Sequence, residues 1–319
     1  MDWLPDALID RLRETIARPD FTGTKYQLME EIGRGGMGTV YLAHDSQLGR
    51  RVALKVIDVL ATDEQAAARM AEEARILARL EHPGIVPVHD LGTLPDGRIF
   101  YAMKMIEGAR LDRYAETKPP LADLLRVFSR VCEAVAFAHS QGVIHRDLKP
   151  ENIMVGQFGE VLVLDWGVAK ITGAARAVPA ADSGARKATA DGTVVGTRDY
   201  MSPEQAAGDI DRVAACSDIY ALGATLSTLL ASMYKAGVPP KRLAAIARKA
   251  ASQNPTQRYA SVPEMSREIG RFLDGEPVLA YRESVVERMA RLAERHKALI
   301  VLVAVYLATR ILLFLFFRR

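Results

Sequence analysis

The chain has 319 residues, of which 49% are hydrophobic and 25% are charged, so it can bury a large core and is neither a disordered nor a fibrous protein. Its formal net charge is +3, and part of the basic excess comes from arginines near the C-terminus, so we expect no general affinity for nucleic acid. The two cysteines, Cys132 and Cys216, have apolar or small neighbours, which predicts core thiols in a reducing compartment and no disulfide framework.

Residues 1–25 are expected to form an N-terminal helical extension. Leu4, Leu8, Leu12 and Ile16 recur at helical spacing, which predicts a short amphipathic helix that packs on the body of the protein or on a partner. No basic start followed by an apolar run is present here, so we expect no signal peptide.

A region rich in strands follows the extension. Between residues 26 and 57, three segments alternate apolar and polar residues and are separated by turns that contain glycine, which predicts an antiparallel meander. Residues 62–82 then have the pattern of a helix with a capping box at its start. Leu77 and Leu80 lie on the predicted inward face of this helix, and Glu73 lies on the same face.

After a further strand region that ends near Ile106, the pattern becomes mostly helical, most clearly over residues 121–142. A β-rich part followed by an α-rich part predicts an α+β fold in two lobes with a cleft between them. Residues 171–196 are small and polar without a period, so we expect a long mobile loop there.

The apolar run from Ala298 to Phe317 is long enough to cross a bilayer as a helix, and only Arg310 interrupts it. Basic residues are more frequent before the run than after it, which predicts that the preceding residues stay in the cytoplasm. We expect a single membrane span at the inner or plasma membrane, with a basic juxtamembrane segment at 276–297. The alternative is a buried helix or one that lies on a surface.

The segment "IGRGGMGTVY" carries glycines between two predicted strands. A dinucleotide-binding motif would place them between a strand and a helix, so that interpretation is disfavoured. A strand-turn-strand loop of glycines can instead bring backbone N–H groups close to phosphates. The alternative for this segment is an ordinary hairpin rich in glycine.

Lys55 lies in a predicted strand among apolar neighbours, where an unpaired ammonium group would be unfavourable. Glu73 is its expected partner. The alternative is that this pair is structural.

The segment "IHRDLKPENIMV" holds three polar side chains between apolar ends. Asp147 could orient a hydroxyl or accept its proton, Lys149 could stand near a transferring phosphate, and Asn152 could bind a metal ion. Asp165 follows a predicted hairpin and could hold Mg²⁺ against phosphates. Phosphoryl transfer needs this set, because its barrier is lowered mainly by positioning and by cations.

At this point the chain resembles a Hanks-type, eukaryotic-like Ser/Thr protein kinase of the bacterial, membrane-anchored kind. The resemblance covers Tyr26 to Gly275 and rests on "GRGGMG", "VALK", the helix Glu, "HRDLKPEN", "LDWG", "GTRDYMSPEQ" and "SDIYALG" in the family's order. It implies a bilobal kinase domain over residues 26–275, with an N-lobe at 26–106 and a C-lobe at 107–275.

The resemblance also implies the site. Asp147 and Lys149 become catalytic residues, Thr197 contacts them, and Asn152 and Asp165 hold Mg²⁺, or Mn²⁺ in its place. The positions implied to contact ATP are Ile32, Gly33, Gly35, Gly36, Gly38, Val40, Ala53, Lys55, Glu73, Met103, Lys104, Met105 and Ile106.

Regulation and support follow from the same resemblance. Arg146 before the catalytic Asp marks activation through a phosphorylated loop, for which Thr189 and Thr193 are the candidates. The alternative is an unmodified, solvated loop. Glu204 is expected to pair with Arg258, and Asp218 to brace the catalytic loop. We expect His145 to support the core and not to act as a general base. Three further histidines are expected to pack and not to bind a metal ion: His82, His89 and His139.

Three positions depart from the family pattern. Trp166 replaces the usual Phe, and Ser202 replaces the usual Ala. We expect Trp166 to keep the apolar packing and Ser202 to keep the small size of the usual residue. The third departure is larger, because "KAGV" nearly joins two helices between which the family carries a further helix that helps to dock substrates and partners.

The sequence therefore predicts a membrane-anchored Ser/Thr kinase that phosphorylates itself and cytosolic proteins. A membrane-tethered scaffold that binds nucleotide without efficient catalysis is the alternative. A small-molecule phosphotransferase is disfavoured, since it would not require Thr197 or a long activation segment.

Overall fold

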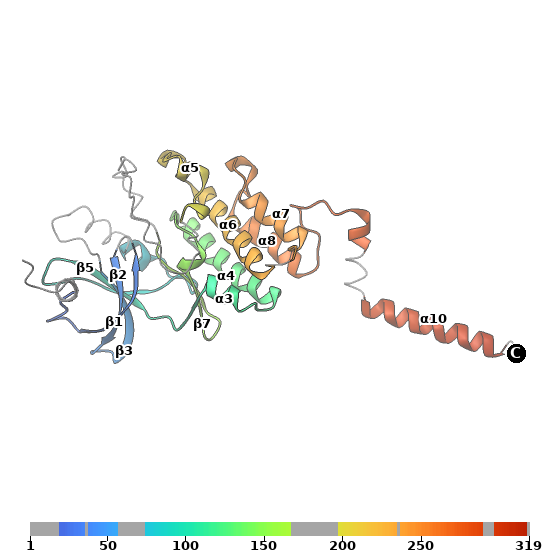
Figure 1. Ribbon diagram of the computed structural model, residues 1–319, viewed down its shortest axis with the longest axis horizontal. Coiled ribbons are helices and arrows are strands. Elements are labelled where there is room, and N and C mark those ends of the chain that lie inside the picture. The colour runs from blue at the N-terminus through green and yellow to red at the C-terminus, as the bar shows by residue number, and fades with distance from the viewer. Residues whose placement is uncertain are drawn as a thin grey trace, which may run out of the picture.

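The computed structural model describes residues 19–35, 38–56, 74–166, 197–234, 237–289 and 297–317. Several predictions fall on residues outside these ranges. They are the helix through Leu4 to Ile16, the loop at 171–196, Gly36, Glu73, Thr189 and Thr193. Within the described ranges a sheet lobe precedes a helical lobe, as predicted, and α10 lies beyond both (Figure 1).

The sheet lobe contains five antiparallel strands in the order β1-β2-β3-β5-β4. Their bounds are Tyr26–Gly35 for β1, Gly38–Asp45 for β2, Arg50–Val56 for β3, Val88–Thr93 for β4 and Ile99–Lys104 for β5. The predicted meander is confirmed as β1 to β3. One side of the sheet is buried in a small core around Val52, Leu54 and Phe100.

The described end of the N-terminal extension, residues 19–25, is a turn, whereas the helix predicted through Leu4 to Ile16 lies outside the described residues. Pro19 disfavours a helix that continues through it, and Gly23 has a φ of 82°, which residues with a side chain rarely adopt. The turn has a packing role, because Phe21 is buried and meets the Phe100 ring edge-on at 5.0 Å.

Of the helix predicted over 62–82, the structure describes the last turns. Residues 74–79 are helical, and Leu77 and Leu80 are buried, as the inward face required. The part that carries Glu73 is outside the described residues.

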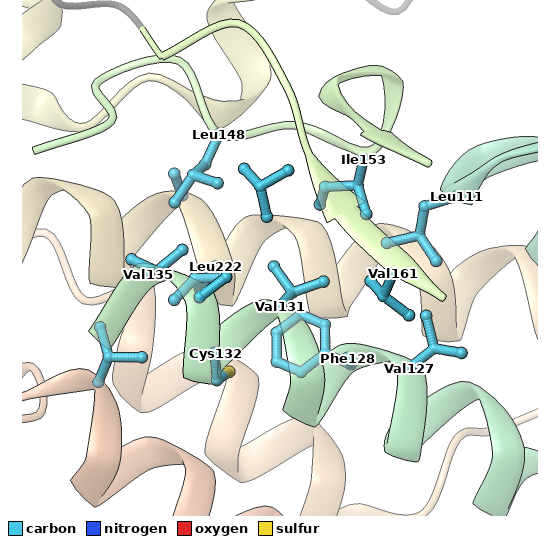
Figure 2. Close-up of a cluster of buried hydrophobic side chains, with 14 of the residues drawn as sticks. Leu111, Val127, Phe128, Val131, Cys132, Val135, Leu148, Ile153, Val161 and Leu222 are labelled. Atoms are coloured by element: carbon cyan, nitrogen blue, oxygen red, sulfur yellow. The ribbon is translucent and has the colours of Figure 1, made fainter. Parts of the chain in front are cut away.

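The helical lobe is built on α4, whose 3.6-residue apolar period was visible in the sequence. Its bounds are Leu121–Ser140, and its buried face includes Phe128, Val131 and Val135. Figure 2 shows these side chains against Leu148 and against Leu222 of α6. The loop that carries Asp147 and Leu148 therefore packs on the centre of the helical lobe.

The remaining helices and strands of this lobe are short, apart from α6. The helices are α3 Leu111–Glu116, α5 Pro203–Ala206, α6 Ala215–Met233, α7 Lys241–Ala250 and α8 Val262–Leu273, with 3-10 turns η1 Pro150–Asn152, η3 Thr197–Tyr200, η4 Ile210–Arg212 and η5 Pro255–Gln257. A small sheet contains β6 Gly108–Arg110, β7 Ile153–Gly156 and β8 Val161–Val163.

Helices α6 and α7 pack directly on each other, with only residues 234–240 between them. Gly223 of α6 makes the close approach possible, because a Cβ atom there would lie 2.6 Å from the backbone nitrogen of Ala251. On the outer side of α6, Ser227, Thr228 and Ala231 are exposed, so the surface left by the short connection is small and polar.

Both cysteines are free, as predicted, and Cys132 is buried in the core. Helix α10 spans Lys297–Phe317 and leaves apolar side chains such as Leu302 and Tyr306 exposed. Among the residues that the structure describes, no helix combines the length and the hydropathy needed to cross a membrane.

Candidate active site

Asp147 lies in the loop between α4 and η1, and two side chains fix its carboxylate. Lys149 Nζ lies 3.0 Å from Asp147 Oδ2, and Asn152 Nδ2 donates to the same oxygen at 3.2 Å and to the Asp147 carbonyl at 2.8 Å. Asn152 is buried, and the other two are half-buried. The three polar side chains named from the sequence therefore form one hydrogen-bonded cluster, in which the Asp147 carboxylate is fixed next to the Lys149 ammonium group.

The backbone under this cluster is held by Asp218 of α6. Its two carboxylate oxygens accept hydrogen bonds from the backbone N–H groups of His145 and Arg146, each at 2.8 Å. Arg146 has a φ of 68°, an unusual value for a residue with a side chain, so the loop needs such support. The predicted role of Asp218 as a brace is confirmed.

His145 is fully buried and links two parts of the site. Its Nδ1 accepts from the Asp147 backbone N–H at 3.3 Å, and its Nε2 lies 2.9 Å from the carbonyl of Leu164. One ring nitrogen accepts and the other donates, which is the neutral form. Burial lowers the pKa of His145, in agreement with a neutral supporting residue.

Lys55 of β3 reaches across to the helical lobe. Its Nζ lies 2.8 Å from Oδ1 of Asp165, which follows β8 and has a φ of 49°. Burial acts to raise the pKa of Asp165, but the charge of Lys55, its hydrogen bond and the charges of more distant basic groups together outweigh burial, and the pKa is lowered. Glu73, the partner predicted for Lys55, lies outside the described residues, so the described contact of Lys55 is one that the sequence had not suggested.

Several of the predicted ATP-contacting residues lie on the strand of Lys55 or on strands that pair with it. Ala53 and Lys55 of β3 pair in register with Met103 and Tyr101 of β5, which brings the strand of the lysine next to the segment 104–106. Ala53, Met103 and Ile106 are buried, whereas Ile32 is 43% exposed.

The described glycines of "GRGGMG", Gly33, Gly35 and Gly38, lie at the end of the β1–β2 hairpin. Gly33 pairs with Val40, and Gly35 pairs with Gly38, which has a φ of 145°. The strand-turn-strand arrangement that separates this loop from a dinucleotide-binding motif is therefore present.

The donor set fits a magnesium ion held against phosphates. Asn152 uses its amide nitrogen on Asp147, which leaves the amide oxygen as a possible ligand, and Asp165 supplies a carboxylate with a lowered pKa. Mg²⁺ is commonly bound through one or two such side chains together with substrate phosphates. No cluster of three or more His, Cys, Asp or Glu side chains suited to a metal occurs in the described part of the chain.

The two mild departures from the family pattern each have a structural account. Trp166 is fully buried and donates from Nε1 to the Val163 carbonyl at 3.4 Å. Its ring is tilted by 43° against the His145 ring, with ring centroids 4.7 Å apart. Ser202 is fully buried at the start of α5, where it forms a capping box with Gln205. Both side chains therefore fill the positions that a Phe and an Ala were expected to fill.

Behind the site, Glu204 and Arg258 form the predicted ion pair. Arg258 donates from Nη1 and Nη2 to the two Glu204 oxygens at 2.7 and 2.9 Å, and both side chains are buried. Burial acts to raise the pKa of Glu204, but the hydrogen bonds from Arg258 and Ser217 prevail and lower it to about 2.

Two residues have roles that the sequence reasoning missed. His139 was expected only to pack, yet its Nε2 lies 2.8 Å from Asp218 Oδ2. Gln205 was not singled out, and its Nε2 donates to the Arg146 carbonyl at 2.8 Å. The capping-box spacing from Ser202 to Gln205 was a local signal for the second residue. The His139–Asp218 contact joins residues 79 positions apart, so no local sequence pattern predicts it.

Thr197 begins η3, and its backbone is described at the end of the activation segment. At the other end of η3, the Tyr200 side chain is buried, and burial raises its pKa. The contact expected between Thr197 and Asp147 stays a prediction.

Comparison with known proteins agrees with this geometry. The family described as "Protein kinase domain" matches residues 26–275. The chain is 36% identical over 303 residues to "Serine/threonine-protein kinase PknD" of Chlamydia trachomatis, which covers 79% of this chain and 32% of that protein. A protein of the same name from Protochlamydia amoebophila is 36% identical over 297 residues, or 78% of this chain and 30% of that protein. The chain thus spans about a third of the length of these curated relatives.

Among solved structures, the kinase domain of Mycobacterium tuberculosis PknI is similar. It superposes with a TM-score of 0.58 at 26% sequence identity, over 79% of this chain and 96% of that domain. A double mutant of the same domain gives the same TM-score and identity over 77% of this chain and 95% of that domain.

Proposed function

Because the chain belongs to the protein kinase family, we propose that it transfers the γ-phosphate of ATP to Ser and Thr hydroxyls of itself and of cytosolic proteins. The observation that carries this proposal is the connected cluster of Asp147, Lys149 and Asn152, with the Lys55–Asp165 pair bridging from the other lobe. The relatives named as Ser/Thr protein kinases support the choice of acceptor.

In the proposed mechanism, each side chain has a task that its position permits. Asp147 accepts a hydrogen bond from the acceptor hydroxyl and aims its oxygen at the phosphorus atom. Lys149, 3.0 Å from that carboxylate, places a positive charge where the oxygens of the transferring group gather negative charge. Lys55 binds the remaining phosphates.

Asn152 and Asp165 would hold Mg²⁺, or Mn²⁺ in its place. When bound, the ion would supply positive charge that offsets the negative charge of the phosphate groups. In this proposal, residues 104–106, which begin at the end of β5, face the adenine of ATP. The β1–β2 hairpin covers the phosphates of ATP with its backbone N–H groups.

Activation is proposed to involve phosphorylation of the activation segment by the kinase itself. Thr189 and Thr193 are the candidate acceptors, and Arg146 is the candidate partner of the added charge, because an Arg next to the catalytic Asp can couple a phosphate to the loop. The sequence is the basis for this step.

We further propose that residues 298–317 anchor the catalytic domain in the inner or plasma membrane, with that domain in the cytoplasm. Arg310 is the one charged residue among these twenty, and the basic residues concentrated before the run favour this orientation. The exposed apolar side chains of α10, such as Leu302 and Val305, would contact lipid.

The catalytic proposal is tested with the full chain, purified in detergent micelles after phosphatase treatment and incubated with Mg²⁺ and ATP. Asp147→Asn is the matched control, because it keeps the shape of the side chain and removes its charge. We expect phosphate to accumulate with time in the unmodified chain only, on Thr189, Thr193 or other Ser and Thr residues mapped by mass spectrometry. ATP binding without any incorporation would instead favour a nucleotide-binding scaffold.

The anchor is tested separately by fractionating cells that express the full chain. We expect it to remain with the membranes after a carbonate wash, and a matched chain truncated after residue 297 to leave them. Recovery of the full chain in the washed soluble fraction would contradict the anchor and leave the catalytic proposal intact.

A further inference from the structure

The segment that leaves the helical lobe, residues 276–289, is held against that lobe, and we call it the strap. Val278 is buried, and the backbone N–H of Ala280 donates to Glu268 of α8 at 2.9 Å. At the start of the strap, Arg242 of α7 donates to the Glu276 carbonyl at 3.2 Å. The strap is therefore part of the folded domain and does not behave as a linker up to this point.

The end of the strap is a short helix at 285–289, and Glu287 fastens it. Ser284 caps this helix, since its Oγ accepts from the Glu287 N–H at 3.2 Å while Glu287 accepts from the Ser284 N–H at 3.0 Å. Glu287 also accepts from Lys241 of α7 and from Tyr281, both at 3.0 Å. These hydrogen bonds, led by the one from the Ser284 backbone, lower the pKa of Glu287 to about 2.

Fastening by Glu287 fixes which side of the short helix points away from the domain. Successive helical residues are separated by about 100°, so Val285, Val286 and Met289 lie together on the side opposite Glu287. Their side chains are 79%, 77% and 65% exposed. Arg282 and Arg288 are exposed beside them. An apolar face flanked by arginines is thus presented to the surroundings in a fixed orientation.

We infer that this apolar face, formed by Val285, Val286 and Met289, is a membrane-contact surface that inserts between anionic lipid headgroups, with Arg282 and Arg288 binding their phosphates. The inference rests on the proposed anchor. It adds that the domain is held against the bilayer through its α7 and α8 side, whereas an anchor alone would leave the domain free to turn.

Two observations favour a bilayer as the occupant. First, the seven residues between Met289 and α10 can span at most about 25 Å when fully extended, so the face cannot lie far from the start of the proposed span. Second, the charges agree, because the sequence between the two helices adds Arg291 and Arg295 to the arginines of the strap. Apolar side chains among basic ones are typical of segments that lie in the headgroup region of anionic membranes.

The test places a nitroxide on the face in the full chain. Val286→Cys is labelled in a Cys216→Ser background, because Cys132 is buried, and the chain is reconstituted in vesicles of phosphatidylcholine alone or with added phosphatidylglycerol. Leu48→Cys, an exposed apolar position of the sheet lobe, is the matched control. Accessibility of each nitroxide to oxygen and to a water-soluble nickel chelate is measured by electron paramagnetic resonance.

We expect the label at residue 286 to be protected from the nickel chelate and open to oxygen in the anionic vesicles. That protection should weaken in phosphatidylcholine and at about 1 M salt, where the Debye length falls to about 3 Å. The label at residue 48 should stay in water throughout. Equal exposure of both labels to the chelate would overturn the inference. Equal protection of the label at residue 286 in both lipid mixtures would overturn the claim that the face requires anionic lipids.

Two other outcomes are separable. Spin–spin broadening at residue 286 that disappears on dilution with unlabelled chain would assign the face to a second copy and overturn a lipid contact. Vesicle flotation after a carbonate wash, measured on the same samples, reports the anchor itself. If the chain floats with the vesicles but the label at residue 286 is exposed to water, only the membrane contact of the strap is contradicted. If the chain no longer floats, both the anchor and the membrane contact are contradicted.

Discussion

At the scale of single residues, the active site is organised by carboxylates that do different work. Asp147 and Asp165 lie where substrate and cation are proposed to bind, while Asp218 and Glu204 hold the backbone and the lobe behind them. The first two are partly exposed and the last two are buried, so their substitution should separate catalysis from stability.

Asp218→Asn should lower kcat and leave the KM for ATP nearly unchanged. A carboxylate accepts from the N–H groups of both His145 and Arg146, whereas an amide has a single acceptor oxygen, so one N–H would lose its partner and the catalytic loop would shift. A displacement of about 1 Å can lower the rate by about 100-fold. Steady-state phosphorylation at varied ATP measures the two constants, with Asp209→Asn in an exposed ion pair as the control. A rise in KM with an unchanged kcat would contradict a positioning role.

Glu204→Gln should destabilise the protein by about 3 to 5 kcal/mol, because the buried Arg258 charge would lose its counter-charge. The control is Arg126→Gln, which breaks a surface pair with Asp123 and should change the free energy of unfolding by no more than about 1 kcal/mol. Urea unfolding of the unmodified chain and of the two variants at neutral pH measures both changes in the free energy of unfolding. Similar values for the two variants would show that the Glu204–Arg258 pair contributes no more than a surface pair.

The same pair should make stability depend on pH in a predictable direction. The pKa of Glu204 is about 2 in the folded protein against an ordinary value of 4.5, so the unfolded chain binds more protons between these values. The stabilisation is therefore fully present above about pH 4.5 and is lost as the pH falls toward 2. The gap in unfolding free energy between the unmodified chain and Glu204→Gln should narrow from neutral pH to about pH 3.5. A gap that stays constant over this range would contradict the shifted pKa.

At the scale of elements, the α6–α7 junction is where the sequence predicts the largest departure from the family pattern. The two helices are in direct contact, and Gly223 is the point of closest approach. The exposed residues on the outer side of α6 include Ser227, Thr228 and Ala231, so no large apolar side chain is exposed at these positions. The effect of the short connection on the docking of protein substrates stays a prediction.

Gly223→Ala should destabilise the protein by about 1 to 3 kcal/mol, because the new methyl group would meet backbone atoms of α7 that cannot move independently. Gly270→Ala is the matched control, since Gly270 also lies within a helix and its Cβ would point into open space. There alanine should stabilise by about 0.5 to 1 kcal/mol through its higher helix propensity. Thermal unfolding distinguishes the two, and equal effects would show that the helices can separate to admit the methyl group.

Elements with a clear period were predictable, and contacts between distant elements were not. The meander β1–β3 and the helix α4 follow directly from the alternation and the 3.6-residue period of their apolar residues. The Lys55–Asp165 contact joins residues 110 positions apart, and the His139–Asp218 contact has no local signal either. Residues 19–25 form a turn, because Pro19 disfavours a helix and Gly23 adopts a positive φ. The helix predicted before them stays a prediction.

At the scale of the whole molecule, the two lobes share one buried apolar core, which includes Tyr101 of the sheet lobe and Phe128 of the helical lobe. Polar contacts also join them, among them the Lys55–Asp165 pair and the hydrogen bond from the Val86 backbone N–H to the Val163 carbonyl at 3.3 Å. Because Lys55 belongs to the sheet lobe and Asp165 to the helical lobe, a single substitution tests whether the lobes act jointly on ATP.

Lys55→Met should lower the rate of autophosphorylation by about 100-fold or more, because it removes a preorganised cation from the phosphate site while keeping an apolar stem among apolar neighbours. Lys118→Met, at an exposed position of the helical lobe, should leave the rate unchanged. Initial rates on the full chain measure both, with circular dichroism as a check on folding. Comparable rates for the two variants would mean that phosphate binding does not use the sheet lobe.

The buried position of Trp166 has an optical consequence. The chain contains two tryptophans, Trp3 and Trp166, so a Trp3→Phe variant has a single indole, directly after Asp165 in sequence and enclosed against the His145 ring. Its fluorescence maximum should be at short wavelength in the folded protein and should shift to longer wavelength if the segment turns outward into water. Binding of a cation beside Asp165 could then be followed by intrinsic emission, without any attached dye and without phosphate transfer taking place.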